Sequence, residues 1–447
     1  MKIVVAGAGG VGTYLTERLV QENHDLVVVD QNPDVLESLA SLHDIQTVQG
    51  TTSSIATLRD AGLESADIFI AATSSDEANL ISCLLADSIK PDLRIIARVR
   101  SLLTDARGLS DRIRDVFDEF INPDREVVEV MLRLLEVPGA SEVNDFVDGK
   151  VRVVGTTISD EMPIVNMPLK EIHKDDEAAN IFVAAVARDN HLFIPSGDTV
   201  LKAGDTVYFV TEPRTSNQVM EWVGARFEPV RTVIIWGGSN SGRLLAKRLV
   251  ERDIRVKLID PEVEHCEILA SELNDVVVLN GSGTDQELLI EEGVEEAGFF
   301  VGATEDEEEN ILAALLAKKL GCQRSGVMIN NMSYMDLVKK IGVDVALNHR
   351  IMAASSILKF VRKGTVSSVF SIHDDDAEVI ETTAKAGSKI VGRPLMNMHF
   401  PQGALVAAVV KKGHVIIPRG NTVIEPDDRL VLISDRSVLS KIEKLLA

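Results

Sequence analysis

Short apolar runs alternate along the chain with longer segments whose apolar residues recur at helical spacing. Residues 2–6 form such a run, a glycine-rich turn follows at 7–12, and an amphipathic segment comes next. A second apolar run, 27–29, ends at Asp30. This order predicts a strand, a tight turn, a helix and a second strand with an acid at its carboxyl end, which is the arrangement of a dinucleotide-binding βαβ unit.

The same unit occurs a second time. Residues 231–236 lead into the glycine turn 237–242, and the strand that follows ends at Asp260. The spacing from the last glycine to the acid is the same in both copies, because 30 − 12 and 260 − 242 both give 18. Further matches pair 48–51 with 279–282, 72–73 with 303–304, and the strand expected at 94–99 with that at 325–330. A unit repeated in register is a far more specific signal than a single glycine loop.

Each copy also predicts a helix that opens with a capping box. The candidate pairs are Ser74 with Glu77 and Thr304 with Glu307. In each pair the hydroxyl would accept a hydrogen bond from a free N–H, and the acid would reach back to the cap residue. Strands that alternate with helices at short spacing predict a parallel sheet covered on both faces.

The sequence pattern changes after each copy. Residues 150–210 and the stretch from 404 onward read as short strands with Pro and Gly at the turns, and 193–200 matches 416–423. Because Pro and Gly are confined to strand edges and turns, these segments predict small α+β modules. The expected fold class is α/β, with two Rossmann-like parallel-sheet domains that are each followed by a small α+β module. The expected domains cover residues 1–138, 139–228, 229–364 and 365–447.

Composition narrows the choice of partners and compartment. The chain has 447 residues, three cysteines and a net charge of −23, and this charge argues against a nucleic-acid partner. No stretch approaches the roughly 20 apolar residues that cross a bilayer, so we expect no membrane span of its own. The strand at residue 2 leaves no room for a signal peptide, and the cysteine spacing fits a reducing cytoplasm. We expect no metal site, because the acids at 305–309 are ordinary helix-dipole partners and 373–376 reads as a solvated hairpin tip.

In the first copy each glycine has a mechanical role. Gly7 permits the tight turn, Gly9 lets the backbone approach a pyrophosphate, and Gly12 allows the helix to pack closely on the strand. The helix N-terminus then offers free N–H groups to the phosphates. Asp30 is placed to accept hydrogen bonds from ribose hydroxyls and would repel a 2′-phosphate, so we expect NAD rather than NADP.

The second copy departs from this pattern. Ser239 replaces the middle glycine and adds a Cβ where the backbone would contact a pyrophosphate, whereas Asp260 remains. Three interpretations stay open for this loop: weaker binding of the same ligand, a different ligand such as an adenine mononucleotide, or an empty site.

Arg98 lies at the carboxyl end of an expected strand, where open α/β sheets bind their ligands. It would clamp a phosphate or stack on a base, and the alternative interpretation is a surface ion pair. Its counterpart in the second copy is Asn330, or Ile329 if the register slips by one residue.

Signs of catalysis are missing. No segment reads as a catalytic domain that would place a His or Lys beside a nicotinamide ring. Neither glycine loop is a P-loop, since Arg243 follows the second loop where a Lys and a hydroxyl residue would stand. We therefore expect that the protein is not an enzyme.

Over essentially all of its length the chain resembles the TrkA family, the nucleotide-binding regulatory subunits of bacterial and archaeal Trk potassium-uptake systems. In that family two RCK (regulator of potassium conductance) units stand in tandem, each with a Rossmann half and a C-terminal half. The segments that carry the resemblance are 7–12, 48–50, 72–77, 96–101, 138–140 and 283–289.

The resemblance implies two nucleotide sites that bind NAD or NADH, with ATP or ADP as further candidates. The first site would be lined by Gly7, Ala8, Gly9, Gly10, Val11, Gly12, Asp30, Thr51, Ala72, Thr73 and Arg98. The second would be lined by Gly237, Gly238, Ser239, Asn240, Ser241, Asp260, Ala303, Thr304 and Asn330.

The resemblance also implies partners and a place in the cell. We expect a homo-oligomeric ring, a tetramer, that is cytoplasmic and peripheral on the inner face of the plasma membrane. It would lie below a membrane potassium-translocating subunit of the TrkH type, and nucleotides would shift the ring between conformations. Two alternatives remain: an RCK-type regulator of another cation channel or antiporter, and an NAD-dependent oxidoreductase.

Overall fold

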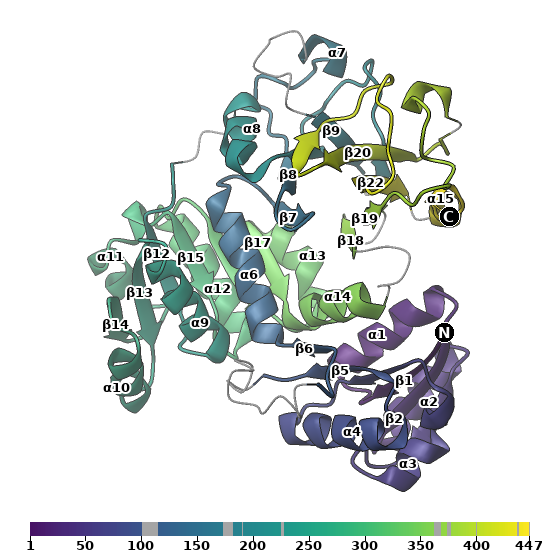
Figure 1. Ribbon diagram of the computed structural model, residues 1–447. Helices are drawn as coiled ribbons and strands as arrows, with labels where there is room; N and C mark the ends of the chain where they lie inside the picture. The colour runs from purple at the N-terminus through teal and green to yellow at the C-terminus, as the bar shows by residue number, and fades with distance from the viewer. Residues whose placement is uncertain are drawn as a thin grey trace. The chain divides into compact units, whose positions relative to one another are not determined.

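The computed structural model describes most of the chain (Figure 1). Left undescribed are residues 101–114, 173–181, 190, 225–227, 362–367, 373–376, 399, 436–437 and 447. The described residues form two compact units. The first contains residues 1–129 and 232–361, and the second contains 130–231 and 362–447.

The first unit holds two parallel sheets of the same topology. The strand order of one sheet is β3-β2-β1-β4-β5-β6, and that of the other is β14-β13-β12-β15-β16-β17. The first sheet consists of β1 (Lys2–Ala6), β2 (Asp25–Asp30), β3 (Gln46–Gln49), β4 (Ile68–Ala71), β5 (Arg94–Arg98) and β6 (Glu119–Ile121). The second consists of β12 (Thr232–Trp236), β13 (Arg255–Asp260), β14 (Val276–Asn280), β15 (Phe299–Gly302), β16 (Ser325–Ile329) and β17 (Val345–Asn348). This confirms both Rossmann-like domains and their repeat.

Helices connect the strands of both sheets. In the first half they are α1 (Gly10–Gln21), α2 (Pro33–Leu42), α3 (Ile55–Asp60) and α4 (Asp76–Ile89). In the second half they are α9 (Asn240–Val250), α10 (Val263–Glu272), α11 (Gln286–Glu291), α12 (Glu307–Lys319) and α13 (Met332–Lys340). Alternate residues of β1 enter different cores, Ile3 and Val5 on one face and Val4 and Ala6 on the other. A strand buried on both faces needs a continuous apolar run, which is what residues 2–6 supply.

The last helix of each Rossmann half contacts the other half. After β6 comes α6 (Pro123–Glu136), and after β17 comes α14 (His349–Val361). Five apolar residues of α14 join the core around α1, and Figure 1 draws α14 beside α1: Ala353, Ala354, Ile357, Leu358 and Val361. In the opposite direction, Glu129 of α6 pairs with Arg248 of α9 at 2.9 Å. The first half therefore completes its core with a helix from the second, and the second receives polar contacts from α6 of the first.

A buried polar contact lies where α6 and α14 meet α9 of the second Rossmann half. The hydroxyl of Ser241 donates to Oδ1 of Asp124 at 2.8 Å and lies 2.8 Å from Nε2 of His349. A hydroxyl has one hydrogen to donate, so Nε2 of His349 must be the donor in the second bond. Nδ1 of His349 is buried without a partner, which agrees with a neutral ring protonated at Nε2. Burial lowers the pKa of His349, although the charge of Asp124 opposes this shift.

The second unit contains two antiparallel sheets that confirm the small modules. Their strand orders, β10-β9-β11-β8-β7 and β18-β19-β22-β20-β21, are the same arrangement written in opposite directions. The first sheet consists of β7 (Glu142–Phe146), β8 (Val151–Thr157), β9 (Phe182–Arg188), β10 (His191–Phe193) and β11 (Thr206–Thr211). The second consists of β18 (Ser368–Ile372), β19 (Ala377–Thr383), β20 (Ala404–Lys411), β21 (His414–Ile416) and β22 (Arg429–Asp435). The helices of this unit are α7 (Leu169–Ile172), α8 (Ser216–Trp222) and α15 (Leu439–Leu446).

The two antiparallel sheets share one core. Ala185 and Tyr208 of the first sheet pack in the same cluster as Ala407 and Val431 of the second. A charged contact lies beside this core, where Arg429 pairs with Asp148 and with Glu381. The two modules therefore pack as one body. The boundaries of the four domains stay predictions, and the one expected near 364 lies outside the described residues.

The capping boxes are wrong. Helix α4 begins at Asp76 and is capped by Ser75, which accepts from the N–H of Ala78, and α12 begins at Glu307 and is capped by Asp306. The hydroxyl of Thr304 instead donates to the carbonyl of Asp306, which fixes the turn before the helix. The carboxylate of Glu307 accepts from two backbone N–H groups that follow β16 rather than from a cap residue.

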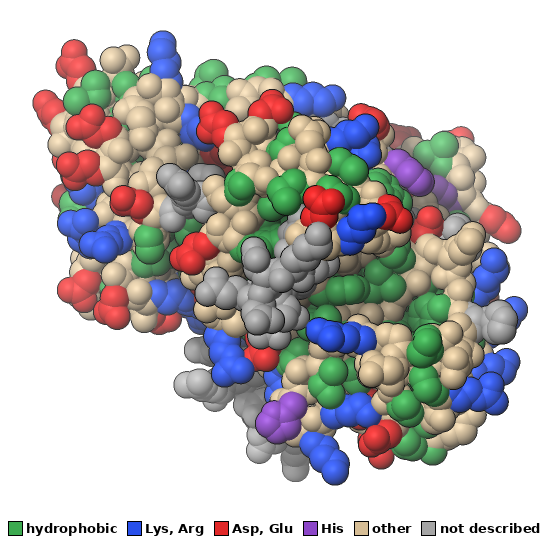
Figure 2. All heavy atoms as spheres, turned by 90° about the horizontal axis from the view of Figure 1, so that it is seen from above, with side chains coloured by type: hydrophobic (Ala, Val, Ile, Leu, Met, Phe, Trp, Pro, Cys, Tyr) green, Lys and Arg blue, Asp and Glu red, His purple; other side chains and the backbone are tan. Residues whose placement is uncertain are grey.

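The exposed surface carries both signs of charge. Figure 2 shows acidic and basic side chains on one face of the molecule, although the chain has an overall charge of −23. The net negative charge therefore belongs to the whole chain, and this face still carries basic side chains.

The largely buried His349 makes the contact between the Rossmann halves sensitive to acid. Because the pKa of His349 is lower in the folded state than the unfolded value of about 6.5, the unfolded chain binds the proton more tightly. The stability that neutral His349 contributes is complete above about pH 6.5 and declines as the pH falls below it, by at most about 1.4 kcal/mol per pH unit. His349→Gln, which keeps a donor near Ser241, removes this loss.

The measurement is thermal unfolding at about pH 7.5 and about pH 5.5, on either side of the unfolded value. The chain has two tryptophans, so a Trp222→Phe background leaves Trp236 of β12 as the fluorescent reporter. We expect the melting temperature to fall further on acidification with His349 than with Gln. An equal fall in both proteins would contradict the assignment.

Candidate functional site

The first candidate site lies at the carboxyl edge of the first sheet. Parallel strands end together at one edge, and open α/β sheets bind ligands there. This edge carries the turn after β1, Asp30 at the end of β2, Thr51 after β3, Thr73 after β4 and Arg98 at the end of β5.

Two glycines shape the turn between β1 and α1. Gly7 has φ of +105°, a conformation that L side chains rarely adopt, and a Cβ placed on it would lie 2.8 Å from the backbone nitrogen of Thr73. A Cβ on Gly12 would lie 1.8 Å from the carbonyl oxygen of Gly7. The tight turn and the close helix packing expected of these two residues are both confirmed.

Gly9 leaves the N-terminus of α1 open. It is the N-cap residue, it is exposed, and it has no side chain to accept from the first N–H groups of the helix. Nothing lies within 4 Å of a Cβ placed on it. The first N–H groups of a helix have no partner within the helix, and together with the helix dipole they attract anions.

Asp30 ties the turn to β2 and keeps capacity for a ligand. Its Oδ2 accepts from the N–H of Ala8 at 2.6 Å, and its Oδ1 accepts from the N–H of Asn32 at 2.9 Å. Each carboxylate oxygen has a second lone pair, and the residue is only partly buried. Asp30 therefore has the position and the free acceptor sites that ribose hydroxyls require.

Asn79 organises the edge between β4 and β5, and the sequence reasoning assigned it no role. Its Oδ1 accepts from the N–H and the hydroxyl of Thr73 at 2.9 and 2.7 Å. Its Nδ2 donates to the carbonyls of Thr73 and Arg98 at 3.1 and 2.8 Å. The repeat carried the signal that could have found it, since Asn310 makes the same four contacts with Thr304 and Met328.

Arg98 is buried at this edge, so the surface ion pair considered from the sequence is wrong. Only 7% of the residue is exposed, and its Nη1 donates to the carbonyl of Thr73 at 2.6 Å. Its Nε is buried without a partner. Burial lowers the pKa of Arg98 to about 10; the positive charges of Arg100 and Arg350 act in the same direction, and the carboxylates of Asp76 and Asp124 oppose it. The guanidinium is still charged at neutral pH, and its Nε–H remains without an acceptor.

Other expected residues take structural positions. The side chains of Val11 and Ala72 are buried in the core around α1. Thr51 is exposed, and its hydroxyl lies 2.9 Å from that of Ser53. Any contact of Val11 or Ala72 with a ligand would therefore be made by the backbone.

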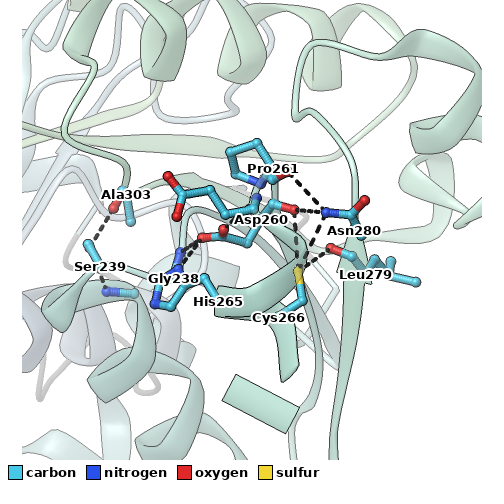
Figure 3. Close-up of polar contacts among 11 residues, drawn as sticks. Gly238, Ser239, Asp260, Pro261, His265, Cys266, Leu279, Asn280 and Ala303 are labelled. Atoms are coloured by element: carbon cyan, nitrogen blue, oxygen red, sulfur yellow. Dashed lines mark hydrogen bonds and ion pairs between the residues drawn. The ribbon is translucent and has the colours of Figure 1, made fainter. Parts of the chain in front are cut away.

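The second loop is filled by its own side chains (Figure 3). Asp260 is 5% exposed and accepts from the N–H of Gly238 at 2.9 Å and from that of Glu262 at 3.1 Å. Nδ1 of His265 also lies 3.1 Å from Oδ2 of Asp260. A Cβ on Gly238 would lie 2.4 Å from Cδ1 of Leu269. Asp260 thus has fewer acceptor sites free than Asp30.

Ser239 closes the N-terminus of α9. Its hydroxyl accepts from the N–H of Gly242 at 3.3 Å and donates to the carbonyl of Ala303 at 2.5 Å (Figure 3). The hydroxyl of Ser241 is occupied by Asp124 and His349 as described above, and the side chain of Asn240 accepts from Arg243. Where Gly9 leaves N–H groups open, Ser239 satisfies one of them.

The proposed counterpart of Arg98 is wrong in either register. Nδ2 of Asn79 bonds the carbonyl of Arg98, and the equivalent Nδ2 of Asn310 bonds that of Met328. Met328 is therefore the counterpart of Arg98. The same shift makes Asn330 the counterpart of Arg100. The N–H of Asn330 donates to the carboxylate of Glu307 at 2.8 Å, as the N–H of Arg100 donates to that of Asp76 at 2.9 Å. One residue fewer separates helix from strand in the second copy, since 328 − 310 is 18 and 98 − 79 is 19.

The described residues form neither a metal centre nor a membrane-spanning helix. Within the described ranges, no group of three or more His, Cys, Asp or Glu side chains is arranged to hold a metal ion, and the segment 373–376 lies outside those ranges. Of the acids at 305–309, Glu308 accepts from the hydroxyl of Tyr334 at 2.6 Å. No helix in the described part of the chain is long and apolar enough to cross a membrane.

Comparison with known sequences identifies the family. The TrkA-N domain family matches residues 3–110 and 233–349, and the TrkA-C domain family matches 153–224 and 379–447. A Trk system potassium uptake protein TrkA from Halomonas elongata is 36% identical over 450 residues, which cover 100% of this chain and 98% of that protein. The chain belongs to the TrkA family. The protein of the same name from Vibrio alginolyticus is 34% identical over 451 residues, with the same coverage.

Solved structures show the same fold. The crystal structure of the GsuK RCK domain matches with a TM-score of 0.61 and 18% identity, and the match covers 100% of this chain and 94% of that one. The GsuK channel matches with a TM-score of 0.62 and 19% identity over 99% of this chain and 78% of that one. The tandem arrangement of the TrkA family is therefore built here on the RCK fold.

The network around Asn79 yields a prediction about stability. Asn79→Ala leaves the partly buried N–H of Thr73 and two carbonyls without this partner, and we expect it to destabilise the protein by about 1–3 kcal/mol. Ser88→Ala is the control, because Ser88 is an exposed residue of the same helix that bonds only a neighbouring carbonyl. Melting temperatures compared by calorimetry check this. If both variants have the melting temperature of the wild type, Asn79 does not organise the edge.

Proposed function

We propose that this chain is the nucleotide-binding regulatory subunit of a potassium-uptake system and that it gates a membrane potassium-translocating subunit of the TrkH type. The observation that carries the proposal is the edge of the first sheet, where the open N-terminus of α1, the carboxylate of Asp30 and the buried guanidinium of Arg98 lie together. Membership of the TrkA family connects such a site with potassium uptake.

NAD or NADH is the proposed ligand of the first site. Free N–H groups at a helix N-terminus suit a pyrophosphate, and Asp30 suits ribose hydroxyls while disfavouring a 2′-phosphate. One structure of similar fold, 18% identical with a TM-score of 0.61, is that of the GsuK channel bound to NAD. ATP and ADP share the pyrophosphate and remain further candidates.

A regulatory role needs two states of the assembly. A nucleotide shifts a conformational equilibrium only by binding one state more tightly than the other, and typical couplings are about 1–3 kcal/mol per site. We propose that the chain forms a homo-oligomeric ring, a tetramer, on the cytoplasmic face of the plasma membrane, in which several sites add their effects. Catalysis, nucleic acid and metal ions have no part in this proposal.

Two other functions are distinguished by experiment. An NAD-dependent oxidoreductase would change the NADH absorbance band with a substrate, whereas a sensor binds without turnover. A regulator of another cation channel or antiporter would bind nucleotide equally well but would co-purify with a different membrane protein.

The test of the nucleotide site is calorimetric titration of the full chain with NAD⁺, NADH, NADPH, ATP and ADP. Asp30→Ala should weaken NAD(H) binding by about 10-fold or more, because a charge-assisted hydrogen bond contributes about 1.5–3 kcal/mol. Asp260→Ala is the matched control in the second loop. A ligand lost only in Asp260→Ala would assign the second loop instead, and no binding by any of the five would refute the nucleotide switch.

The test of gating is potassium flux. Vesicles that contain a TrkH-type protein should conduct potassium in a way that depends on this chain and on the nucleotide that titration identifies. Asp30→Ala should shift the response to a nucleotide concentration about 10-fold higher or more, while the chain still binds the membrane protein. Flux that is indifferent to the wild-type chain would refute the potassium role.

A further inference from the structure

Arg350 of the second Rossmann half lies against the glycine loop of the first. It is the second residue of α14, the helix that packs against α1, and the Oδ1 of Asn348 accepts from its N–H at 2.9 Å. A Cβ placed on Gly10 would lie 2.4 Å from Nε and 2.6 Å from Cζ of Arg350. The guanidinium is therefore seated over the first turn of α1, next to the exposed Gly9.

This guanidinium has no protein partner in the part of the chain that the structure describes. Arg350 is exposed, and none of the described carboxylates forms an ion pair with it. Arg98, whose buried Nε also lacks a partner, is close enough for Arg350 and Arg100 to disfavour its charged form. The carboxylate of Asp124 is bonded by Ser241, and that of Asp76 accepts from the N–H of Arg100.

Arg98, Arg100 and Arg350 thus gather at one end of the first site, and the carboxylates of Asp76 and Asp124 offset only part of their positive charge. Like charges at close range cost free energy unless an anion offsets them. The open N–H groups of α1 add the positive end of a helix dipole at the same place. The unpartnered Nε of Arg98 and the guanidinium over Gly10 are separate observations, and both point to a ligand with several negative charges.

The second loop provides an internal comparison. Arg98 and Arg100 correspond to Met328 and Asn330, as shown above. Arg350 corresponds to Asp124, because each stands two residues after an asparagine, Asn348 or Asn122, whose Oδ1 accepts from the N–H groups at the start of its helix. In the second copy, uncharged Met328 and Asn330 and the acid Asp124 therefore stand where the first copy has three arginines.

We propose that Arg350 is a phosphate-binding residue of the first nucleotide site and that the site is complete only with this helix of the second half. The inference rests on the proposed function of the first site and adds a residue and a ligand class to it. The ligand class is a nucleotide with at least two phosphates. Since Arg350 belongs to α14, a bound diphosphate connects α14 to α1, and binding adds to the free energy that holds the two halves together.

Titration of the full chain with ADP, NADH and adenosine tests the assignment. Arg350→Gln should weaken ADP and NADH binding about 10- to 100-fold, because it removes a charge-assisted contact, and should change adenosine binding less than about twofold. Arg350→Lys keeps the charge without the planar guanidinium, and its affinity for ADP and NADH should fall between those of the wild type and Arg350→Gln. Arg214→Gln is the matched control, since Arg214 is an exposed arginine of the second unit.

The outcomes separate this inference from the proposed function. If the wild type binds none of the three probes, the proposed function fails. If the wild type binds ADP or NADH, Asp30→Ala weakens that binding, and Arg350→Gln binds as tightly as wild type, the nucleotide site stands and the role of Arg350 is refuted. Equal weakening of adenosine and ADP by Arg350→Gln would also overturn it, because loss of a phosphate contact cannot weaken adenosine.

Hydrogen exchange supplies a second readout that does not depend on affinity. At saturating ADP, wild-type peptides from residues 349–361 should exchange more slowly than without ligand, as should peptides from 10–21. In Arg350→Gln at saturating ADP we expect the protection of 10–21 to remain and that of 349–361 to be lost. Retained protection at 349–361 would refute the connection through Arg350.

Discussion

The structure of the first unit depends on the contacts that α6 and α14 make with the Rossmann half to which they do not belong. Burial of apolar area is the main favourable term in folding, and α14 supplies the core around α1 with five buried aliphatic residues. Without this helix, Leu15 and Leu19 of α1 would lose part of their cover. The two halves are therefore parts of one folded body, and a ligand at the first loop lies beside a helix from each half.

The same exchange makes two similar loops unequal. Both loops share the turn geometry, with φ of +105° at Gly7 and +108° at Gly237. They differ in two respects. Ser239 caps α9, whereas Gly9 leaves the N-terminus of α1 open. In addition, α14 places Arg350 beside the first loop, whereas α6 places Asp124 beside the second. A duplicated fold has thus produced one site suited to a polyanion and one loop closed by its own side chains.

Much of this could be predicted because it depends on local pattern. Apolar runs, glycine turns and their repetition specified both parallel sheets, and the turn residues indicated the small α+β modules. The cap residues could not be read correctly, since Thr73 and Thr304 accept from the N–H groups of the cap residues Ser75 and Asp306, and it is Ser75 and Asp306 that accept from the helix. The counterpart of Arg98 was missed because one residue fewer in the second copy shifts the strand without disturbing its apolar pattern.

The fold class, the repeat, the glycine turns and the acids at the ends of β2 and β13 all follow from local patterns in the chain. The surroundings of these residues depend on tertiary packing. Ser241 is far from Asp124 and His349 along the chain, and so is Arg350 from Gly10, yet each pair meets in space. Contacts of this kind leave no periodicity in the sequence, because they depend on which sheet a helix packs against, and that is set by burial over the whole unit.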